Sequence, residues 1–396
     1  MYEPCLHEFT RAAYCGGRSE VFRERFDGLC GCGGTHKPLN YADFNSMYAW
    51  AMLGPMPVEY ISDMFSHDGW NRPGALKGLM GFVRCTVDIP LDCYLPPLPY
   101  RLNGKLVFPV GTFTGTWTTE ELSLLPLVNG RIVNVEKAVW FKGQVLFDAY
   151  VKSWYAYRHT ENDPAKNAIG KQYLTNLYGK FGQTPEREKL YFFPSDEELS
   201  EHVLTPLPNV PPSMGAFSEV TYTAPPYIIP HIAAWITSRS RSLLWRTMSD
   251  YLSRGYRIYY CDTDSIITDA PVTSSSALGE LKLECQVKRA RFVAPKLYFL
   301  ETLDKGGIVK AKGFSGGFGG KGLTEAEFNE LVDHRATVAI QRMTKLREGI
   351  RSGKRFPTKK HLRKGLREGI LDEKRIHLED GNTKPIDVTG LDALGP

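Results

Sequence analysis

The chain has 396 residues, of which 42% are hydrophobic, and a formal net charge of +5. This length is enough for a large core and two or three subdomains. The sequence contains no apolar run of about 18 residues and no signal peptide, so neither a membrane span nor secretion is supported. Its eight cysteines are irregularly spaced. That spacing does not form a disulfide framework and favours an intracellular, reducing setting.

Residues 1–40 form a short lead-in that contains the segment Tyr14–Gly17. Cys30 and Cys32, with His36 close by, raise the possibility of a zinc site. The cysteine spacing is C-x-C in a glycine-rich stretch, whereas a structural zinc site needs four well-placed ligands. A glycine-rich turn is therefore favoured over zinc.

A strand followed by a helix is expected at the start of residues 41–95. Tyr41 and Ala42 enter as a strand, Asp43 lies at its end, and a helix begins over Met47–Met52. A strand-to-helix turn exposes backbone N–H groups, which suits a triphosphate. Alternatively, Asp43 caps the helix, and both roles are compatible. Further along, Phe82–Ile89 alternates like a strand.

A β-rich insertion is expected over residues 96–150. Pro96, Pro97, Pro99 and Pro109 punctuate this stretch, and Lys105–Trp117 alternates in short strand-like pieces.

Residues 151–182 are expected to form an antiparallel pair of helices. Within them, apolar residues recur at helical spacing, and Gly179 is the expected C-cap. Lys171, Thr175 and Tyr178 lie three or four residues apart and share one face. A cation, a small polar group and an aromatic ring on one stripe could hold a phosphate, a sugar and a base. The alternative is an ordinary amphipathic helix with a solvated lysine.

Residues 183–226 are rich in proline and lack a long periodicity. A helix is expected over residues 228–253, which open the segment 227–321. The residues expected on its buried side are Ile232, Trp235, Ile236, Leu243 and Leu244.

Two carboxylates one residue apart then follow in an apolar frame. Asp262 and Asp264 lie between Ile258–Cys261 and Ile266–Ile267, a pattern that predicts the tip of a hairpin with buried strands. Burying two bare carboxylates together costs several kcal/mol unless a cation neutralises them. Mg²⁺ is the economical explanation, because it favours oxygen ligands and substrate phosphates. Ordinary turn chemistry is the alternative, since Asp favours turns.

One segment within residues 322–396 is strongly basic. Arg342–Arg375 carries 13 Lys and Arg against four Asp and Glu, a net charge of +9, so the remainder of the chain carries −4. Such a segment is typical of an element that follows a nucleic-acid backbone. An ordinary solvated charge cluster remains the alternative.

These motifs, in this order, resemble the family B DNA polymerases, and among them the protein-primed branch of phages and linear plasmids. Asp43–Tyr48 is similar to the first palm motif, Lys171–Gly179 to the fingers motif, and Tyr260–Ser265 to the second palm motif. Lys296–Tyr298 matches the Lys-x-Tyr motif, and Tyr14–Gly17 is similar to the Tyr-x-Gly-Gly motif. The resemblance extends from about residue 14 to about residue 375, and each motif alone would be weak.

The chain departs from the family pattern at two places. Ala49 stands where the first palm motif usually has proline, which concerns only the helix start. Thr175 and Asn176 replace Asn-Ser in the fingers motif, which puts in doubt the hydrogen bonds around the incoming nucleotide. Neither departure touches the carboxylates.

The resemblance implies an α+β fold shaped like a right hand: a palm with an antiparallel sheet, helical fingers and a thumb. By position, the template-binding element would lie in residues 1–40. The palm would be formed by residues 41–95 and 227–321, the fingers by residues 151–182 and the thumb by residues 322–396. Residues 96–150 would be the insertion that contacts the priming protein, and 183–226 the insertion that supports strand displacement and processivity.

The resemblance also implies residue roles. Asp43, Asp262 and Asp264 would be catalytic, with two Mg²⁺ ions, or Mn²⁺, held by Asp43, Asp264 and the Phe44 carbonyl. The nucleotide would be bound by Asn45, Ser46, Met47, Tyr48, Arg158, Lys166, Lys171 and Tyr178. DNA would be bound by Tyr14, Gly16, Gly17, Arg18, Thr175, Asn176, Gly179, Thr263, Ser265, Lys296, Tyr298, Lys310, Lys312, Lys359, Lys360, Lys374 and Arg375.

We therefore expect a DNA-templated, protein-primed DNA polymerase that replicates a viral, phage or plasmid genome. Only 42 residues precede Asp43, and they lack an exonuclease pattern, so proofreading is not expected. Expected partners are template and primer DNA, deoxynucleoside triphosphates and a terminal protein that primes synthesis. A monomer is expected, located in the host cytoplasm, or in the nucleus or virion for a eukaryotic virus.

Three other functions remain open. The chain could be an ordinary primer-extending or gap-filling polymerase, or a non-catalytic DNA-binding subunit derived from a polymerase. A two-metal nuclease would also use carboxylates, but it would not explain Tyr48, Tyr178 and Lys171.

Overall fold

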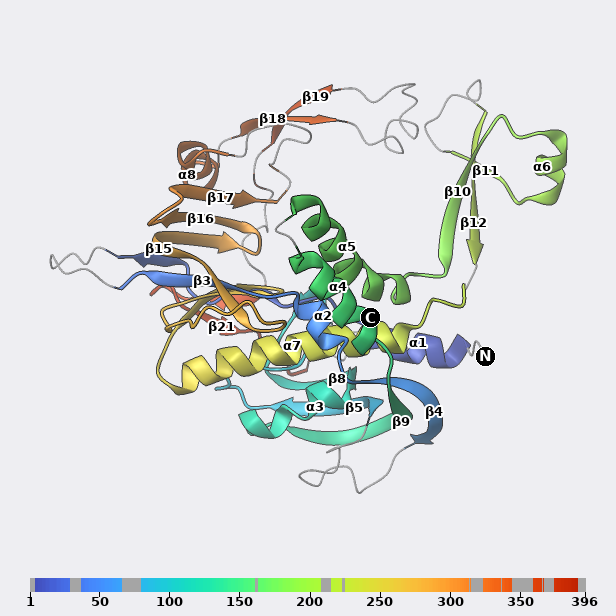
Figure 1. Ribbon diagram of the computed structural model, residues 1–396, viewed down its shortest axis with the longest axis horizontal. Helices are drawn as coiled ribbons and strands as arrows, with labels where there is room; N and C mark the ends of the chain where they lie inside the picture. Colours follow the sequence, from blue (N-terminus) through green and yellow to red (C-terminus); the bar gives the residue numbers. More distant parts are fainter. Residues whose placement is uncertain are drawn as a thin grey trace. The chain divides into compact units, whose positions relative to one another are not determined.

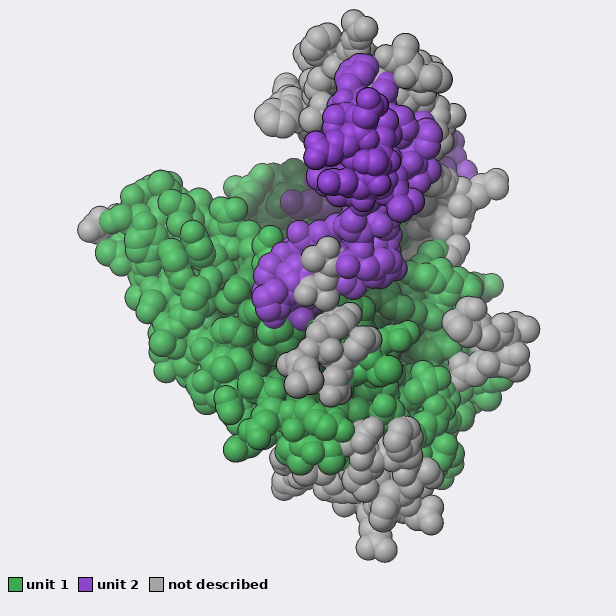
Figure 2. All heavy atoms as spheres, turned by 90° about the vertical axis from the view of Figure 1, so that its right-hand side faces the viewer, with its two compact units in different colours: residues 1–182, 229–308, 369–396 green, residues 183–228, 309–368 purple. Residues whose placement is uncertain are grey.

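The computed structural model describes residues 4–28, 37–65, 80–160, 163–207, 215–222, 225–312, 314, 323–335, 337–343, 359–364, 366 and 374–390. The chain divides into two compact units, one of residues 1–182, 229–308 and 369–396 and one of residues 183–228 and 309–368, coloured separately in Figure 2. Cys30, Cys32 and His36 lie outside the described residues, so the zinc question stays open.

An eight-stranded sheet carries the three predicted acids. Its order is β1-β13-β14-β3-β15-β16-β17, and β2 also pairs with β15. Among these strands, Figure 1 labels β3, β15, β16 and β17. The strands are β1 Ser19–Val21, β2 Arg25–Asp27, β3 Leu39–Phe44, β13 Ile258–Asp262, β14 Ser265–Thr268, β15 Leu281–Ala294, β16 Leu297–Thr302 and β17 Gly307–Ala311. The hairpin predicted around Asp262 and Asp264 is confirmed as β13 and β14, which pair antiparallel.

The two faces of this sheet have separate cores. Phe44, Cys261 and Ile266 pack on one face with the second half of the long helix α7, Pro230–Ser253. Leu39 and Ile267 pack on the other face. Because side chains alternate along a strand, Asp43 lies on the same face as Leu39 and Tyr41. The helix therefore covers one face, and the carboxylate lies on the other.

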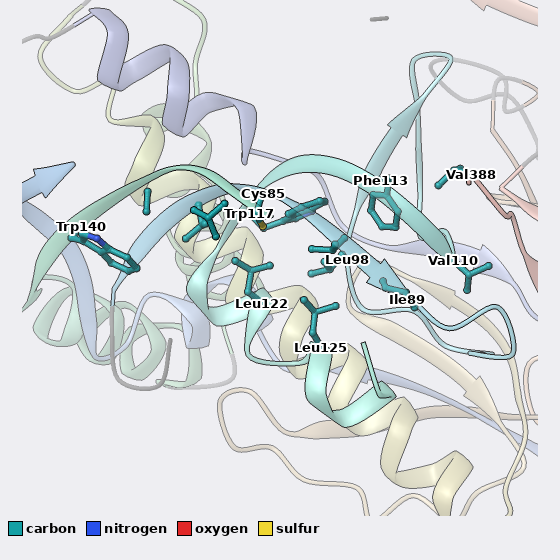
Figure 3. Packing of buried hydrophobic residues seen from close by; sticks show 14 residues of the cluster. Cys85, Ile89, Leu98, Val110, Phe113, Trp117, Leu122, Leu125, Trp140 and Val388 are labelled. Atoms are coloured by element: carbon teal, nitrogen blue, oxygen red, sulfur yellow. The ribbon is translucent and has the colours of Figure 1, made fainter. Parts of the chain in front are cut away.

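A second, four-stranded sheet has the order β4-β9-β5-β8. Its strands are β4 Pro55–Phe65, β5 Gly81–Ile89, β8 Gly111–Thr118 and β9 Arg131–Val145. Cys85, Phe113, Trp117 and Leu125 lie in its core (Figure 3). The expected strand over Phe82–Ile89 is thus present, but it pairs with β8 and β9 and does not join the sheet of the acids.

Helices connect and cover these sheets. They are α1 Pro4–Ala12, α2 Met47–Ala51, α3 Thr119–Leu122, a 3₁₀ turn at Leu125–Val128, α4 Asp148–His159 and α5 Pro164–Phe181. The expected helix pair is confirmed as α4 and α5. Gly179 is not the C-cap, because α5 continues to Phe181 and ends at Gly182. The first half of α7 packs in a core that includes α2, α5 and the second sheet.

The expected buried side of α7 is largely confirmed. Ile232, Trp235, Ile236 and Leu244 are buried, while Leu243 is partly buried. The helix has one feature that the apolar pattern does not predict: Arg241 is also buried, with 3% of its surface exposed. No described helix is both long enough and apolar enough to span a membrane.

Two small hairpins complete the first unit. They are β6 Tyr100–Leu102 with β7 Lys105–Val107, and β20 Arg375–His377 with β21 Thr383–Pro385. Residues 369–396, the last part of the predicted thumb, belong to this first unit. Val388 lies in the core of the second sheet, and its N–H donates to the Val110 carbonyl at 3.1 Å, so this end of the chain is anchored there.

The second unit is built from short elements. It contains a sheet of the order β10-β12-β11, made of β10 Glu186–Phe192, β11 Thr205–Pro206 and β12 Ala216–Tyr222. It also contains α6 Asp196–Glu201, α8 Glu325–Asp333 and the pair β18 Val338–Met343 and β19 Lys359–Lys364. Ser195 and Thr324 begin α6 and α8 with capping boxes.

Candidate active site

A single register row places the predicted residues side by side. Antiparallel pairing aligns Ser19 with Asp262, Asp262 with Ser265, Ser265 with Asp43, and Asp43 with Lys282. Directly opposite residues on antiparallel strands point to the same face. The N–H of Phe44 also donates to the Asp264 carbonyl at 2.7 Å. Residues more than 200 positions apart in sequence therefore meet on one face.

The tip of the acid hairpin rests against the Tyr14–Arg18 segment. Thr263 adopts a left-handed conformation with φ 63°, and its N–H donates to the Arg18 carbonyl at 2.6 Å. A Cβ on Gly17 would lie only 2.6 Å from the Thr263 side chain. Glycine is therefore required at position 17 for this close approach. The structure thus joins the first predicted motif to the acid hairpin.

Asp43 and Asp264 repel each other. Burial, then the Asp264 carboxylate and then Glu284 raise the pKa of Asp43 to about 7, against the opposing charges of Lys171 and Lys282. Burial also raises the pKa of Asp264, and Asp262 adds to this, while Lys171 and Lys296 oppose it. Two carboxylates in one partly buried place favour a bound cation, which would hold both in the charged form.

Asp262 has a different environment. Its Oδ1 lies 3.2 Å from the Lys296 Nζ. Lys296 has a left-handed φ of 63°, and its N–H donates to the Tyr260 hydroxyl at 2.8 Å. The Asp262 carboxylate thus has a lysine partner, which fits a supporting role beside the other two acids.

The donor set fits a hard divalent cation that is held only in part by the protein. Among the described residues, no three or more His, Cys, Asp or Glu side chains form a group that could hold a metal. Mg²⁺ commonly uses one or two carboxylates together with substrate phosphates and water. Asp43 and Asp264 supply the two carboxylates. The Phe44 side chain is buried, so this residue could offer only its carbonyl.

Helix α5 contributes a cation and an aromatic ring. The charge of Lys171 acts on both Asp43 and Asp264. Two helical turns further on, the Tyr178 ring stacks on Tyr48, with ring centroids 4.2 Å apart and an interplanar angle of 21°. Thr175, between them, donates its hydroxyl to the Lys171 carbonyl at 2.8 Å. The predicted stripe therefore faces the strand-to-helix turn that carries Asp43.

Helix α4 reaches the same turn. The Arg158 guanidinium donates to the Ser46 hydroxyl and to the Asn167 side-chain oxygen, each at 2.8 Å. Ser46 is the N-cap residue of α2 in a left-handed conformation with φ 48°, and it makes no side-chain cap bond. Asp43 does not cap α2, so that alternative is wrong. Lys166 lies partly buried on α5.

Two predicted nucleotide-binding side chains are occupied elsewhere. Met47 is 1% exposed and belongs to the core under α7, so its side chain cannot contact a nucleotide. The Asn45 side chain donates to the Ser275 carbonyl at 2.6 Å, and the Asn45 carbonyl accepts from the Gly279 N–H. Asn45 therefore holds the loop that precedes β15.

Two predicted DNA contacts are buried instead. Arg18 and Arg375 are 1% and 2% exposed, and both guanidinium groups lie close to the Glu20 carboxylate, at 2.6 and 3.8 Å. The Arg375 guanidinium also lies over the Phe22 ring. A buried arginine needs such partners. Neither side chain can reach DNA, so both predictions are corrected to a structural role.

Ser265 and Tyr298 are also buried. Ser265 donates its hydroxyl to the Asp262 carbonyl at 3.2 Å. The Tyr298 ring packs against Tyr260 and Phe292, and its hydroxyl is hydrogen-bonded to Tyr41. With 6% and 5% of their surfaces exposed, these side chains support the acid hairpin from within. The predicted DNA contact of each is corrected accordingly.

The remaining predicted DNA contacts have mixed positions. Gly16 and Asn176 are exposed, and a Cβ on Gly179 would meet nothing within 4 Å. Lys374 donates to the Ser19 carbonyl at 3.1 Å. Lys310 and Lys312 are exposed residues assigned to the second unit. Lys359 and Lys360 lie in β19, but their side chains are outside the described part of the chain.

Sequence reasoning missed three charged residues. Lys282 lies opposite Asp43, and Glu284 follows it. Arg241 lies inside the fold, where its guanidinium donates to Glu121 at 2.8 Å and to the carbonyls of Cys15 and Gly16. Arg241 thereby fixes the segment that contacts the hairpin tip. Strand register and burial depend on distant parts of the chain, so no local motif identified these residues.

The sheet and the acids that it carries narrow the class of fold, and comparison with known proteins gives the family. The family model described as "DNA polymerase type B, organellar and viral" matches residues 3–207, just over half of the chain. The chain belongs to this family. The predicted resemblance to family B and its protein-primed branch is therefore confirmed.

Curated relatives are named as DNA polymerases or probable DNA polymerases. A probable DNA polymerase of Podospora anserina is 28% identical over 355 residues, which cover 78% of this chain and 28% of the relative. One from Agaricus bitorquis is 25% identical over 390 residues, or 86% of this chain and 46% of the relative. The DNA polymerase of Bacillus phage phi29 is 26% identical over 250 residues, which cover 56% of this chain and 38% of the relative. The chain thus spans less than half of the length of these relatives.

Solved structures share the fold. The phi29 DNA polymerase complexed with primer-template DNA and incoming nucleotide substrates has a TM-score of 0.63 at 17% identity, covering 91% of this chain and 63% of that chain. An orthorhombic crystal form of the same polymerase has a TM-score of 0.56 at 16% identity. The match covers 97% of this chain and 62% of that chain. The α+β, right-hand polymerase fold predicted from the sequence is confirmed.

Proposed function

We propose that this chain is the catalytic part of a DNA-templated DNA polymerase that adds deoxynucleotides by two-metal nucleotidyl transfer. The observation that carries the proposal is the meeting of Asp43 and Asp264 on adjacent segments, with Lys171 acting on both. A DNA-binding subunit would gain nothing from clustered carboxylates beside a phosphate polyanion. A catalyst that needs a divalent cation requires them.

Asp43 and Asp264 would hold Mg²⁺, or Mn²⁺ in its place, and the Phe44 carbonyl would add a ligand. When bound, the cations would activate the attacking hydroxyl and stabilise the charge on the leaving pyrophosphate. Asp262, paired with Lys296, would keep this lysine directed at the primer side of the row. The work of these residues is therefore positioning and charge stabilisation.

The nucleotide would lie between α5 and the strand-to-helix turn. Lys171 would neutralise the triphosphate, with Arg158 and Lys166 as helpers, and Ser46 would hold Arg158 in place. The stacked rings of Tyr48 and Tyr178 would form the floor under the sugar and the base pair. A ribose 2′-hydroxyl would collide with the Tyr48 ring, which selects deoxynucleotides.

Template and primer DNA would contact the Tyr14–Gly17 segment, Thr263 and Lys296. Support comes from the contact between this segment and the hairpin tip, and from the exposed surface of Gly16. Thr175, Asn176 and Gly179 on α5 would face the template base, and Lys374 a backbone phosphate. The exposed Lys310 and Lys312, with Lys359 and Lys360, would contact the duplex from the second unit.

Initiation on a terminal protein is a further part of the proposal. Residues 96–150 would contact that protein, and residues 183–226 would support strand displacement and processivity. The thumb, predicted as residues 322–396, would be formed by residues 322–368, because residues 369–396 belong to the first unit. The chain would act as a monomer inside the cell that carries the replicating element. The family match over residues 3–207 includes the first of these segments and part of the second, whereas the thumb lies beyond it and is assigned by its position in the chain.

A primed-template assay with Mg²⁺ and all four deoxynucleotides tests the proposed function. Lengthening of the labelled primer is the expected result. Shortening would indicate a nuclease, and a band shift without any change in primer length would indicate a DNA-binding subunit; either result contradicts the proposal. Incubation with a candidate terminal protein, labelled nucleotide and Mg²⁺ tests priming, because label must then transfer to that protein.

A further inference from the structure

One lysine beside the acid row has no role in the function proposed above. Lys282, on β15, pairs directly with Asp43 across the strands. The side chains of such a pair leave the sheet on the same face, with Cβ atoms about 5 Å apart. Lys282 is about half exposed, so its ammonium group is accessible. It therefore lies at the edge of the place where Asp43 would meet its cation.

A β-bulge next to Lys282 sets its surroundings. The register between β15 and β3 shifts between Leu283 and Cys285, so that Glu284 has no directly opposite partner. A bulge redirects the side chain of its extra residue and is common next to active sites. The Glu284 Oε1 lies 2.8 Å from the Lys282 Nζ. An exposed ion pair of this kind contributes little to stability, so fold stability alone does not explain it.

Two acids of the row each have a lysine beside them. Lys296 pairs with Asp262 on one side, and Lys282 stands next to Asp43 on the other. Lys282 makes its ion pair with Glu284, although a second carboxylate, that of Asp43, lies directly across the strands. An ammonium group at this position can move by rotation of its side chain to a phosphate oxygen brought in by a substrate.

Resting on the proposed function, we propose that Lys282 is a substrate-positioning residue that binds a phosphate oxygen beside Asp43. The phosphate belongs either to the incoming nucleotide or to the nucleic-acid backbone, since both offer the same chemistry. Lys282 binds it as a point charge at the edge opposite Lys296. Glu284 holds the ammonium group in place until the substrate arrives.

Three variants of the full chain test this proposal. Lys282→Gln removes the charge, and Lys282→Arg keeps it. Lys288→Gln is the matched control, because Lys288 lies on the same strand, is equally exposed and makes a similar ion pair with Glu301 at 2.7 Å. Two quantities are measured: the Kd for a primer-template in EDTA over a range of salt concentrations, and the KM for a nucleotide during extension.

We expect Lys282→Gln to raise one of these two constants by about three- to tenfold, while Lys282→Arg and Lys288→Gln stay within about twofold of the wild type. A raised Kd with a salt slope reduced by about one identifies a backbone phosphate. A raised KM alone identifies the triphosphate. Both results support the proposal, and the thermal midpoint should be the same for all variants.

Two results would overturn the assignment. One is a Lys282→Gln variant that matches Lys288→Gln in both constants, and the other is a Lys282→Arg variant as impaired as Lys282→Gln. Either result in a chain that extends primers contradicts the role of Lys282 alone. A wild-type chain that extends no primer contradicts the proposed function, whatever the variants do.

Discussion

At the scale of single residues, the three acids differ in what surrounds them. Asp262 has the Lys296 ammonium group at 3.2 Å, whereas Asp43 and Asp264 are partly buried and the charge of another acid raises the pKa of each. Without a cation, the charged form of both Asp43 and Asp264 is unfavourable, because burial and neighbouring like charges disfavour ionisation. The same arrangement becomes favourable when a divalent ion lies between them.

Gly17 is the residue whose substitution most directly tests the contact between the first motif and the hairpin tip. Because an added Cβ would lie 2.6 Å from the Thr263 side chain, Gly17→Ala should displace the tip. We expect a loss of about 1–3 kcal/mol in the free energy of unfolding and weaker primer extension. Denaturant unfolding and the extension assay measure the two effects.

Gly16→Ala is the control for this substitution, because a Cβ at Gly16 would meet nothing within 4 Å. It should leave stability within about 0.5 kcal/mol of the wild type. Equal effects of the two substitutions on stability would show that the contact with Thr263 is not what requires glycine at position 17.

At the scale of elements, α5 has a glycine that its own packing does not require. Gly179 lies inside the helix, and nothing within the described chain comes close to a Cβ there. Gly179→Ala should therefore stabilise the protein by about 0.5–1 kcal/mol, since alanine favours a helix interior. If DNA passes over this face, the same substitution should slow primer extension. Calorimetry and the extension rate are the measurements.

Gly170 provides the contrast on the same helix. A Cβ there would lie 2.9 Å from the Arg158 Cβ, so Gly170→Ala should destabilise the pairing of α4 with α5. A Gly179→Ala variant that is more stable and fully active would remove the argument that a ligand approaches this position.

The first turn of α7 predicts how stability depends on pH. His231 is largely buried and stacks on Phe141 with ring centroids 4.9 Å apart. Burial, with a further contribution from His7, lowers its pKa to about 4. The folded state therefore keeps His231 neutral, while the unfolded state protonates it below about pH 6.5. Stability should fall as the pH drops from about 6.5 to about 4.

His231→Gln tests this dependence. Between pH 7.5 and pH 5 the wild-type protein should lose about 2 kcal/mol more in the free energy of unfolding than the variant does. Urea denaturation at both pH values measures the difference. The same loss in both proteins would show that His231 is not the group responsible.

Sequence reasoning worked best within elements and failed across them. The hairpin around Asp262 and Asp264 and the strand-to-helix turn after Asp43 follow from local alternation and turn residues, so they could be predicted. The sequence predicts Arg18 and Arg375 as DNA contacts, which would require exposed side chains. Their burial depends on Glu20 and on aromatic rings from other elements. Lys282 faces Asp43 only through a register between strands that are far apart in sequence.

At the scale of the whole molecule, charge is unevenly distributed. The net charge is +5, but Arg342–Arg375 alone carries +9. Binding to a primer-template should therefore be independent of sequence and should weaken steeply with salt, as expected for contacts with backbone phosphates. Fluorescence anisotropy with two duplexes of unrelated sequence measures both properties. Salt-insensitive binding, or a strong preference for one sequence, would contradict this expectation.

The central claim is that Asp43 and Asp264 together hold a catalytic cation, and the rate of primer extension tests it most directly. The measurement compares the wild type with Asp264→Asn under single-turnover conditions in Mg²⁺. Asp304→Asn, in the exposed turn after β16, serves as the control. We predict that Asp264→Asn lowers the rate by at least about a thousandfold while primer-template binding remains, and that Asp304→Asn has no effect. An Asp264→Asn variant that retains most of the wild-type rate would contradict the claim.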